Sequence, residues 1–407
     1  MKDEKKAPKL RFKGFTDDWE QCKAKELFES KSKKDHSDLP VLSATQENGI
    51  VFRNDLDIDI KFDTHALSNY KVVSPGDYII SLRSFQGGFE LSEKRGIISP
   101  AYTVFAFNNQ EKNRQNSTFW KYLFKRYDFI ESLKRLTFGI RDGKAISFNQ
   151  FSTLKLSFPN FDEQNKIATL LHELDRTITL HEEKKCLLER LKSALLQKMF
   201  ADKSGYPAVR FKGFDDIWDQ EKLNSLVRLH RGLTYSPNNV QDSGIRVLRS
   251  SNILDGQFVM TDDDIFVKSS VVNIPTVKDG DILITAANGS IKLVGKHAII
   301  SGISENTAVS GGFMLVGSSR IPDFVNSLFD TSWYQRFIRK YVTGGNGSIG
   351  NLKKNDLDKQ YVKVPTTSEQ GRIGEFFREI DQLIINNQIK HEKLLELKKF
   401  LLQNMFI

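Results

Sequence analysis

The chain repeats one of its own segments, and this repeat limits what it can fold into. PNFDEQNKIATLLHELD, which begins at Pro159, returns as PTTSEQGRIGEFFREID from Pro365. The two copies continue without a gap to Phe200 and Phe406, ending in LLQKMF and LLQNMF, at a constant offset of 206 (369 − 163). A repeat of this length indicates two structural units built on one plan.

A second, shorter repeat opens each half of the chain. PKLRFKGFTDDW from Pro8 matches PAVRFKGFDDIW from Pro207, at an offset of 199 (207 − 8). The segments between the two markers differ between the copies, so the borders are shared and the interiors vary. The sequence therefore predicts four parts: a first domain over 1–158, a first long helix over 159–200, a second domain over 201–364 that opens with the polar linker 201–207, and a second long helix over 365–407.

The repeated EQ segments are predicted to be helical. A proline precedes each start, Asp or Ser occupies the N-cap position, and Glu and Gln follow in the first turn. Apolar residues then recur at alternating spacings of four and three, a heptad pattern with a polar middle. Each helix could simply pack on its own domain, but globular helices usually run about 8–20 residues, whereas these run to some 38. We therefore favour a coiled coil between the copies, which a pseudo-two-fold relation makes antiparallel.

The domain interiors combine strands with shorter helices. Gly76-Asp77 and Gly280-Asp281 each open a hydrophobic run, which suits a turn before a buried strand. The predicted strands are 72–82, 102–107, 276–286 and 297–301, and the predicted amphipathic helices are 117–136 and 321–342. The predicted fold class is thus α+β, with two mixed α/β domains joined by two long helices that form the antiparallel coiled coil.

The charge distribution points to where a polyanion would bind. The formal net charge is +9, with seven basic and six acidic residues in 163–200 and six of each in 369–407. About +8 of the excess therefore lies in the two domains, where we expect any nucleic acid to bind. The chain starts with the charged MKDEKKAPK, has no long apolar run and contains only two cysteines, Cys22 and Cys186. These features fit a cytoplasmic protein without disulfides or a membrane span.

No set of catalytic residues emerges from the sequence. GGNGSIG carries Gly345, Gly347 and Gly350 at G-x-G-x-x-G spacing, but it follows a predicted helix rather than a strand. We interpret it as a loop and not as a nucleotide site. Walker A, H-E-x-x-H and the Asn/Asp-Pro-Pro-aromatic loop of amino-methyltransferases are absent, and the seven histidines show no metal-ligand spacing. We expect neither catalysis nor a metal site in this chain.

These motifs resemble a known family. Two variable domains, each opening near GF…W and closing with a strand, a proline and EQ-x-x-I at the start of a long helix, are similar to the specificity subunit of type I restriction–modification systems. The resemblance implies two target recognition domains that each read half of a bipartite, asymmetric DNA site. It also implies two methyltransferase subunits and restriction (translocase/endonuclease) subunits as partners. S-adenosylmethionine, ATP and Mg would belong to those partners, and this chain would hold no cofactor and no catalytic residue.

Candidate DNA contacts are the side chains that can read base edges or hold phosphates from predicted loops. Arg and Lys suit guanine or phosphate, and Asn and Gln suit adenine. In the first domain we select Arg83, Ser84, Gln86, Arg141 and Lys144. In the second domain we select Arg231, Tyr235, Arg246, Arg249, Ser250, Asn252, Asn288, Lys292, Asn346, Ser348 and Lys353. For any one of them, a solvated loop side chain is an equally good interpretation.

Two other classes of function stay open at this point. One is a self-contained DNA-modifying enzyme with duplicated architecture, which would bind S-adenosylmethionine by itself. The other is a structural coiled-coil adaptor, which would show no salt-dependent binding to duplex DNA. Outward-facing apolar residues of the long helices, Leu170, Leu180, Phe376 and Ile385, either dock the methyltransferase or belong to the core.

Overall fold

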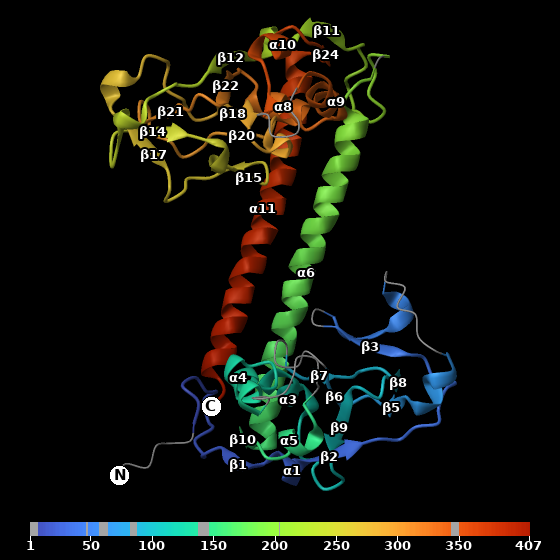
Figure 1. Ribbon diagram of the computed structural model, residues 1–407. Coiled ribbons are helices and arrows are strands. Elements are labelled where there is room, and N and C mark those ends of the chain that lie inside the picture. Colours follow the sequence, from blue (N-terminus) through green and yellow to red (C-terminus); the bar gives the residue numbers. More distant parts are fainter. Residues whose placement is uncertain are drawn as a thin grey trace. The chain divides into compact units, whose positions relative to one another are not determined.

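The structure is a computed structural model that describes residues 7–45, 48–56, 64–81, 88–136, 146–202, 204–342 and 350–407. The chain divides into two compact units (Figure 1). Unit 1 comprises residues 1–182 and 389–407, and unit 2 comprises residues 183–388. The two long helices, α6 (Phe161–Met199) and α11 (Thr367–Asn404), each contribute one half to each unit.

Unit 1 is built on a four-stranded antiparallel sheet in the order β2-β9-β6-β7. Smaller antiparallel pairs, β3-β4, β5-β8 and β1-β10, surround it. Its strands are β1 (Glu20–Lys23), β2 (Phe28–Lys31), β3 (Leu42–Thr45), β4 (Gly49–Phe52), β5 (Lys71–Val73), β6 (Tyr78–Ile80), β7 (Glu90–Leu91), β8 (Gly96–Ile98), β9 (Thr103–Phe107) and β10 (Lys155–Phe158). Its shorter helices are α1 (Ala24–Leu27), η1 (Arg53–Asp55), η2 (Thr64–Asn69), α3 (Ser117–Leu123), α4 (Tyr127–Leu136) and α5 (Phe148–Phe151).

Unit 2 repeats this plan and enlarges it. The sheet β12-β22-β18-β20 corresponds to the main sheet of unit 1, and β11-β24 corresponds to β1-β10. A second four-stranded sheet, β13-β17-β14-β21, includes the parallel pair β14-β21. Its strands are β11 (Asp219–Lys222), β12 (Arg228–Arg231), β13 (Val240–Gln241), β14 (Ile245–Leu248), β15 (Ile253–Leu254), β16 (Gln257–Phe258), β17 (Ile265–Val267), β18 (Ile282–Thr285), β19 (Ala287–Asn288), β20 (His297–Ile299), β21 (Ala308–Ser310), β22 (Met314–Ser318), β23 (Gly350–Asn351) and β24 (Tyr361–Val364). Its shorter helices are α7 (Leu223–Leu226), η3 (Pro237–Asn239), η4 (Ser250–Asn252), η5 (Ser269–Val271), η6 (Ile291–Leu293), α8 (Pro322–Phe329), α9 (Ser332–Tyr341) and α10 (Lys354–Asp358).

The long helices pair inside each unit, as the heptad pattern predicts. In unit 1 the start of α6 packs against the end of α11, and Lys398 Nζ lies 2.7 Å from Asp175 Oδ1. In unit 2 the end of α6 packs against the start of α11, and Lys192 Nζ lies 2.7 Å from Asp381 Oδ1. Asp175 and Asp381, like Lys192 and Lys398, occupy matching positions of the repeat. This order of halves is that of an antiparallel, pseudo-two-fold pair, so the predicted fold class is confirmed.

The two sequence markers meet and close each unit. Arg11 donates from Nε and Nη2 to the two carboxylate oxygens of Glu163, both at 2.7 Å, and Arg210 makes the same two bonds to Glu369. Both glutamates are buried. The following glutamines cap the preceding turn, because Gln164 Nε2 donates to the carbonyl of Pro159 at 2.8 Å. We call each of these Arg–Glu pairs, Arg11–Glu163 and Arg210–Glu369, a clasp.

The shorter helices differ from the predictions. Each predicted amphipathic helix is two helices, α3 and α4 in unit 1 and α8 and α9 in unit 2. In unit 2 the break falls at Asp330, whose carboxylate lies 2.7 Å from Lys192 Nζ and 3.3 Å from His297 Nε2. These contacts hold the end of α8 against α6 and β20. The cap of α6 also differs, since Asn160 rather than Asp162 accepts a hydrogen bond from the Glu163 amide.

Candidate nucleic-acid interface

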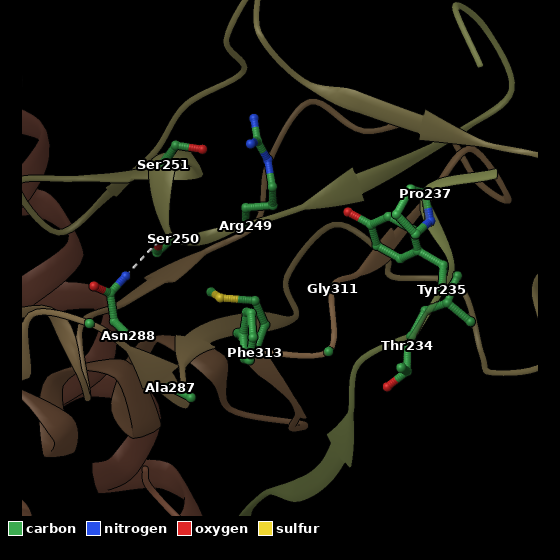
Figure 2. Close-up of a pocket in the computed structure, with 14 residues that line it drawn as sticks. Thr234, Tyr235, Pro237, Arg249, Ser250, Ser251, Ala287, Asn288, Gly311 and Phe313 are labelled. Atoms are coloured by element: carbon green, nitrogen blue, oxygen red, sulfur yellow. Dashed lines mark hydrogen bonds between the residues drawn. The ribbon is translucent and has the colours of Figure 1, made fainter. Parts of the chain in front are cut away.

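A cleft in unit 2 gathers several of the predicted contact residues. Its volume is about 680 Å³, and it opens between the β21–β22 turn, the segment after β12, η4 and β19. Figure 2 shows Phe313 in this cleft, with Asn288 and Ser250 on one side and Tyr235 on the other. The residues that line it are Leu233, Thr234, Tyr235, Pro237, Arg249, Ser250, Ser251, Ala287, Asn288, Gly289, Gly311, Gly312, Phe313 and Met314.

Backbone hydrogen bonds fix the floor of the cleft. The amides of Ala286 and Ala287 both donate to the carbonyl of Phe313, at 2.8 and 2.9 Å. The Gly311 amide donates to the carbonyl of Leu248 at 2.8 Å, which joins the same turn to β14. Close packing requires glycine here, because a Cβ added at Gly232 would lie 1.9 Å from the Gly311 carbonyl oxygen. Four separate segments of the chain are thereby held at one place.

Asn288 has a defined orientation in this cleft. Its backbone lies in β19, opposite Gly350 of β23. Its Oδ1 accepts from the amide of Ser290 at 2.9 Å, and its Nδ2 donates to Ser250 Oγ at 3.2 Å. The bond from the Ser290 amide distinguishes the amide oxygen from the nitrogen, because a backbone N–H can only donate. Because a side-chain amide has two hydrogens and two lone pairs, one of each is left over by the contacts among the described residues.

Arg249 and Tyr235 lie at the edge of the same cleft. Arg249 Nη2 donates to the carbonyl of Asp263 at 2.6 Å and lies 3.2 Å from its carboxylate. Hydrogen bonding to Thr261, and then to Arg249, lowers the pKa of Asp263, so this carboxylate stays ionised and holds the guanidinium. Tyr235 is half-buried beside Pro237. Arg249 is therefore a restrained cation rather than a free one.

Arg246 is half-buried and Asn252 is buried, and both side chains are bonded within the protein, so their predicted contacts with DNA stay predictions. Arg246 pairs with the buried carboxylate of Asp264 and stacks over Phe266, with its Cζ 4.7 Å from the ring centroid. Asn252 is fully buried, accepts from the Arg249 amide at 2.7 Å, and donates to Val259 and Asp264. Neither side chain lines the cleft, and Asn252 supports it by holding the backbone of Arg249.

Three further predicted cations of unit 2, Arg231, Lys292 and Lys353, are exposed. They stay candidates for phosphate contacts. The remaining predicted contacts, Arg83, Ser84, Gln86, Arg141, Lys144, Asn346 and Ser348, lie outside the described residues. Of the four glycines in the GGNGSIG motif, only Gly350 is described, and it belongs to β23 rather than to a turn that opens a helix.

Sequence reasoning missed Phe313, the most exposed large apolar residue of the cleft, at 65 %. The Gly-Gly-Phe sequence of the β21–β22 turn permits a tight turn, but it does not predict an exposed ring, because the same three residues end in the buried Phe89. In the described part of the chain, no three His, Cys, Asp or Glu residues gather as a metal site would need. No helix within these residues combines the length and apolar character of a membrane span.

The fold and the cleft define a class: a duplicated α+β protein in which a shared frame of clasps and long helices carries two different interiors. The chain belongs to the family described as "Type I restriction modification DNA specificity domain", which matches residues 16–190 and again residues 215–398. The double match agrees with the two units and confirms the resemblance drawn from the repeated motifs.

Individual relatives carry names of the same kind. The EcoKI type I restriction enzyme specificity subunit of Escherichia coli K12 is 25 % identical over 244 residues, or 57 % of this chain and 51 % of that protein. This chain thus spans about half the length of that relative. The MjaVIII specificity subunit of Methanocaldococcus jannaschii is 20 % identical over 338 residues, or 81 % of this chain and 77 % of that protein.

A solved structure shares the fold over almost the whole chain. The crystal structure of the type I restriction–modification S subunit from M. genitalium superposes with a TM-score of 0.63 at 14 % identity, covering 98 % of this chain and 99 % of the other. Because the identity is so low, this likeness concerns the fold and says nothing of individual contact residues.

Proposed function

We propose that this chain is the DNA specificity subunit of a type I restriction–modification complex. Each target recognition domain reads one half of a bipartite, asymmetric DNA site, and the paired long helices set the distance between the halves. One observation carries this proposal: identical clasps and matching helix ion pairs enclose interiors that differ. An asymmetric site needs two recognition domains that differ from each other, whereas a fixed spacing needs a frame that is the same in both halves.

The cleft of unit 2 supplies suitable chemistry for a reader. It brings an oriented amide, a hydroxyl, a restrained guanidinium and an exposed aromatic ring to one concave surface, with exposed lysines elsewhere in the unit. Base edges are read by such polar groups together with apolar contacts, and phosphates are held by cations. The basic excess outside the long helices agrees with this division of roles.

The proposal assigns catalysis to partner subunits. Two methyltransferase subunits would use S-adenosylmethionine, and restriction subunits would use ATP and Mg, so that this chain acts without a cofactor in the cytoplasm, where bacterial and archaeal DNA lies. Leu170 and Leu180 are exposed on α6 and stay candidates for methyltransferase docking. Phe376 instead packs against Phe211 with ring centroids 5.7 Å apart, which places it in the local core.

Mapping of methylated adenines tests the proposal. Genomic DNA would be sequenced from cells that carry this chain with its methyltransferase, and from cells that carry the methyltransferase alone. We expect a single interrupted motif with two different halves, present only with this chain. Methylation that is independent of this chain, or that has an uninterrupted motif, would contradict the proposal. Binding of S-adenosylmethionine by the purified chain alone would favour a self-contained enzyme instead.

A further inference from the structure

The cleft of unit 2 carries a more specific inference, which rests on the proposed function. We infer that Asn288 reads an adenine in the half-site of unit 2, and that Phe313 contacts a thymine methyl group beside it. The adenine edge in the major groove offers N7 as an acceptor and N6–H₂ as a donor. An asparagine that reads it must supply one hydrogen and one lone pair.

Asn288 can supply one hydrogen and one lone pair, because its other hydrogen and its other lone pair are already bonded within the protein. Ser290 N–H occupies one lone pair of Oδ1, and Ser250 Oγ accepts one hydrogen of Nδ2. Both anchors belong to the protein, and the Ser290 amide can only donate, so the side-chain amide cannot rotate to offer its groups in the reverse order without losing that hydrogen bond. The residue that reads the base is thus oriented before DNA arrives, and Ser250 is a positioning residue.

The exposed ring of Phe313 favours recognition of an A·T pair over a G·C pair. Its carbonyl accepts the amides of Ala286 and Ala287, so the backbone that carries the ring is bonded directly to the residue before Asn288. A phenylalanine left 65 % exposed has an apolar face that water does not stabilise. The thymine methyl is the apolar group that the major groove presents, and it lies on the pair that also contains adenine.

Arg249 is a weaker candidate for base reading in this cleft. Its Nη2 is already bonded to the carbonyl and carboxylate of Asp263, so the fork that would grip guanine is partly occupied. Asn252 and Arg246 bond to Asp264 and do not line the cleft. Among the described residues of the cleft, Asn288 therefore combines the best-defined orientation with unused hydrogen-bonding capacity.

The test uses the complex of this chain with its methyltransferase, in two steps. Methylated sites are first mapped for the wild type, for Asn288→Asp and for the control Asn224→Asp, which makes the same change in charge at an exposed position of α7 outside the cleft. We expect Asn288→Asp to abolish the preference for adenine at one position of one half-site and to leave the other half unchanged. The control should keep the wild-type motif.

The second step probes the base itself. Duplexes carry 7-deazaadenine in place of the adenine at that position, which removes the N7 acceptor. We expect the wild-type complex to lose affinity about threefold to tenfold, since this removes one of the two hydrogen bonds of the pair. An Asn288→Ala complex should bind both duplexes equally, and Phe313→Ala should lose discrimination between thymine and uracil, which lacks the methyl group.

The outcomes separate this inference from the proposed function. A wild-type complex without any interrupted motif contradicts the proposed function. An interrupted motif that Asn288→Asp leaves unchanged, together with equal loss on 7-deazaadenine for the wild type and Asn288→Ala, overturns the inference alone. Asn288→Asp complexes should still recognise the half-site of unit 1, which shows that the substitution has not unfolded the chain.

Discussion

The clasp of unit 2 allows a quantitative prediction. Arg210 makes two hydrogen bonds of 2.7 Å to Glu369, and the side chain of Glu369 is 1 % exposed. The hydrogen bond to Glu369 raises the pKa of Arg210, so Glu369→Gln leaves a charged guanidinium facing a neutral amide. Removing one partner of a buried ion pair costs about 3–5 kcal/mol of unfolding free energy. For a unit of this size that lowers the melting temperature by roughly 6–20 °C.

Calorimetry of the full chain measures this loss, and hydrogen exchange shows where it falls. Loss of protection should concentrate in unit 2 for Glu369→Gln and in unit 1 for Glu163→Gln, because each clasp lies inside its own unit. Glu375→Gln, on the exposed face of the same helix, should cost less than about 1 kcal/mol. Replacing both partners, as Arg210→Met with Glu369→Leu, should recover most of the stability.

A Glu369→Gln chain that melts within about 2 °C of the wild type would refute this reasoning. So would a double replacement that is as unstable as the sum of its single changes, since the loss would then come from the cavity rather than from the unpaired charge.

Three further predictions concern unit 2. Burial opposes ionisation of Asp330, but the hydrogen bonds and charges of His297 and Lys192 outweigh it and lower its pKa to about 2. Because this folded pKa is below the ordinary 3.8, ionised Asp330 stabilises the fold above pH 3.8, and the stabilisation is lost as the pH falls towards 2. Asp330→Asn should therefore lower the free energy of unfolding by about 2 kcal/mol at pH 7 and leave it nearly unchanged near pH 2. Urea unfolding at the two pH values measures both. Asn252→Ala should lower the free energy of unfolding by about 1–3 kcal/mol in the same assay, because it leaves the Arg249 amide and the Val259 carbonyl without their partner. A change below about 0.5 kcal/mol would contradict the structural role of Asn252. Lys353→Ala should weaken DNA binding by the complex equally for all sequences and reduce the salt slope by about 1, and a change of motif would show instead that Lys353 reads a base.

The repeat in the sequence predicted the frame of the fold because both copies preserve the residues that make it. Arg11 with Glu163, and Arg210 with Glu369, appear in both copies, and so do the Asp and Lys of the helix pair. The sequence did not reveal that these groups touch, since 152 residues separate Arg11 from Glu163. The available signal was that an arginine in one marker and a glutamate in the other recur in both copies. The structure shows that these opposite charges pair.

The reading surface was less predictable because local sequence does not determine exposure. Gly-Gly-Phe occurs twice, yet Phe89 is 0 % exposed and Phe313 is 65 % exposed. The core of unit 1 covers the first ring, whereas the β21–β22 turn carries the second in a cleft. Arg246 and Asn252 similarly fit base reading by residue type, but both bond to the buried carboxylate of Asp264. The exposure of these side chains depends on packing with residues far away in the sequence, and neither residue type nor local spacing reveals that packing.

The central claim is that one chain carries two unlike readers on a repeated frame, one for each half of a DNA site. The most direct measurement uses a chimera in which residues 8–158 also replace residues 207–364, so that both long helices carry the first domain. Methylated adenines would be mapped in cells that hold the chimera with the methyltransferase. The account predicts a symmetric interrupted motif that contains the first half-site twice, in inverted orientation. Methylation at the original asymmetric motif, or at a motif with only one half, would contradict it.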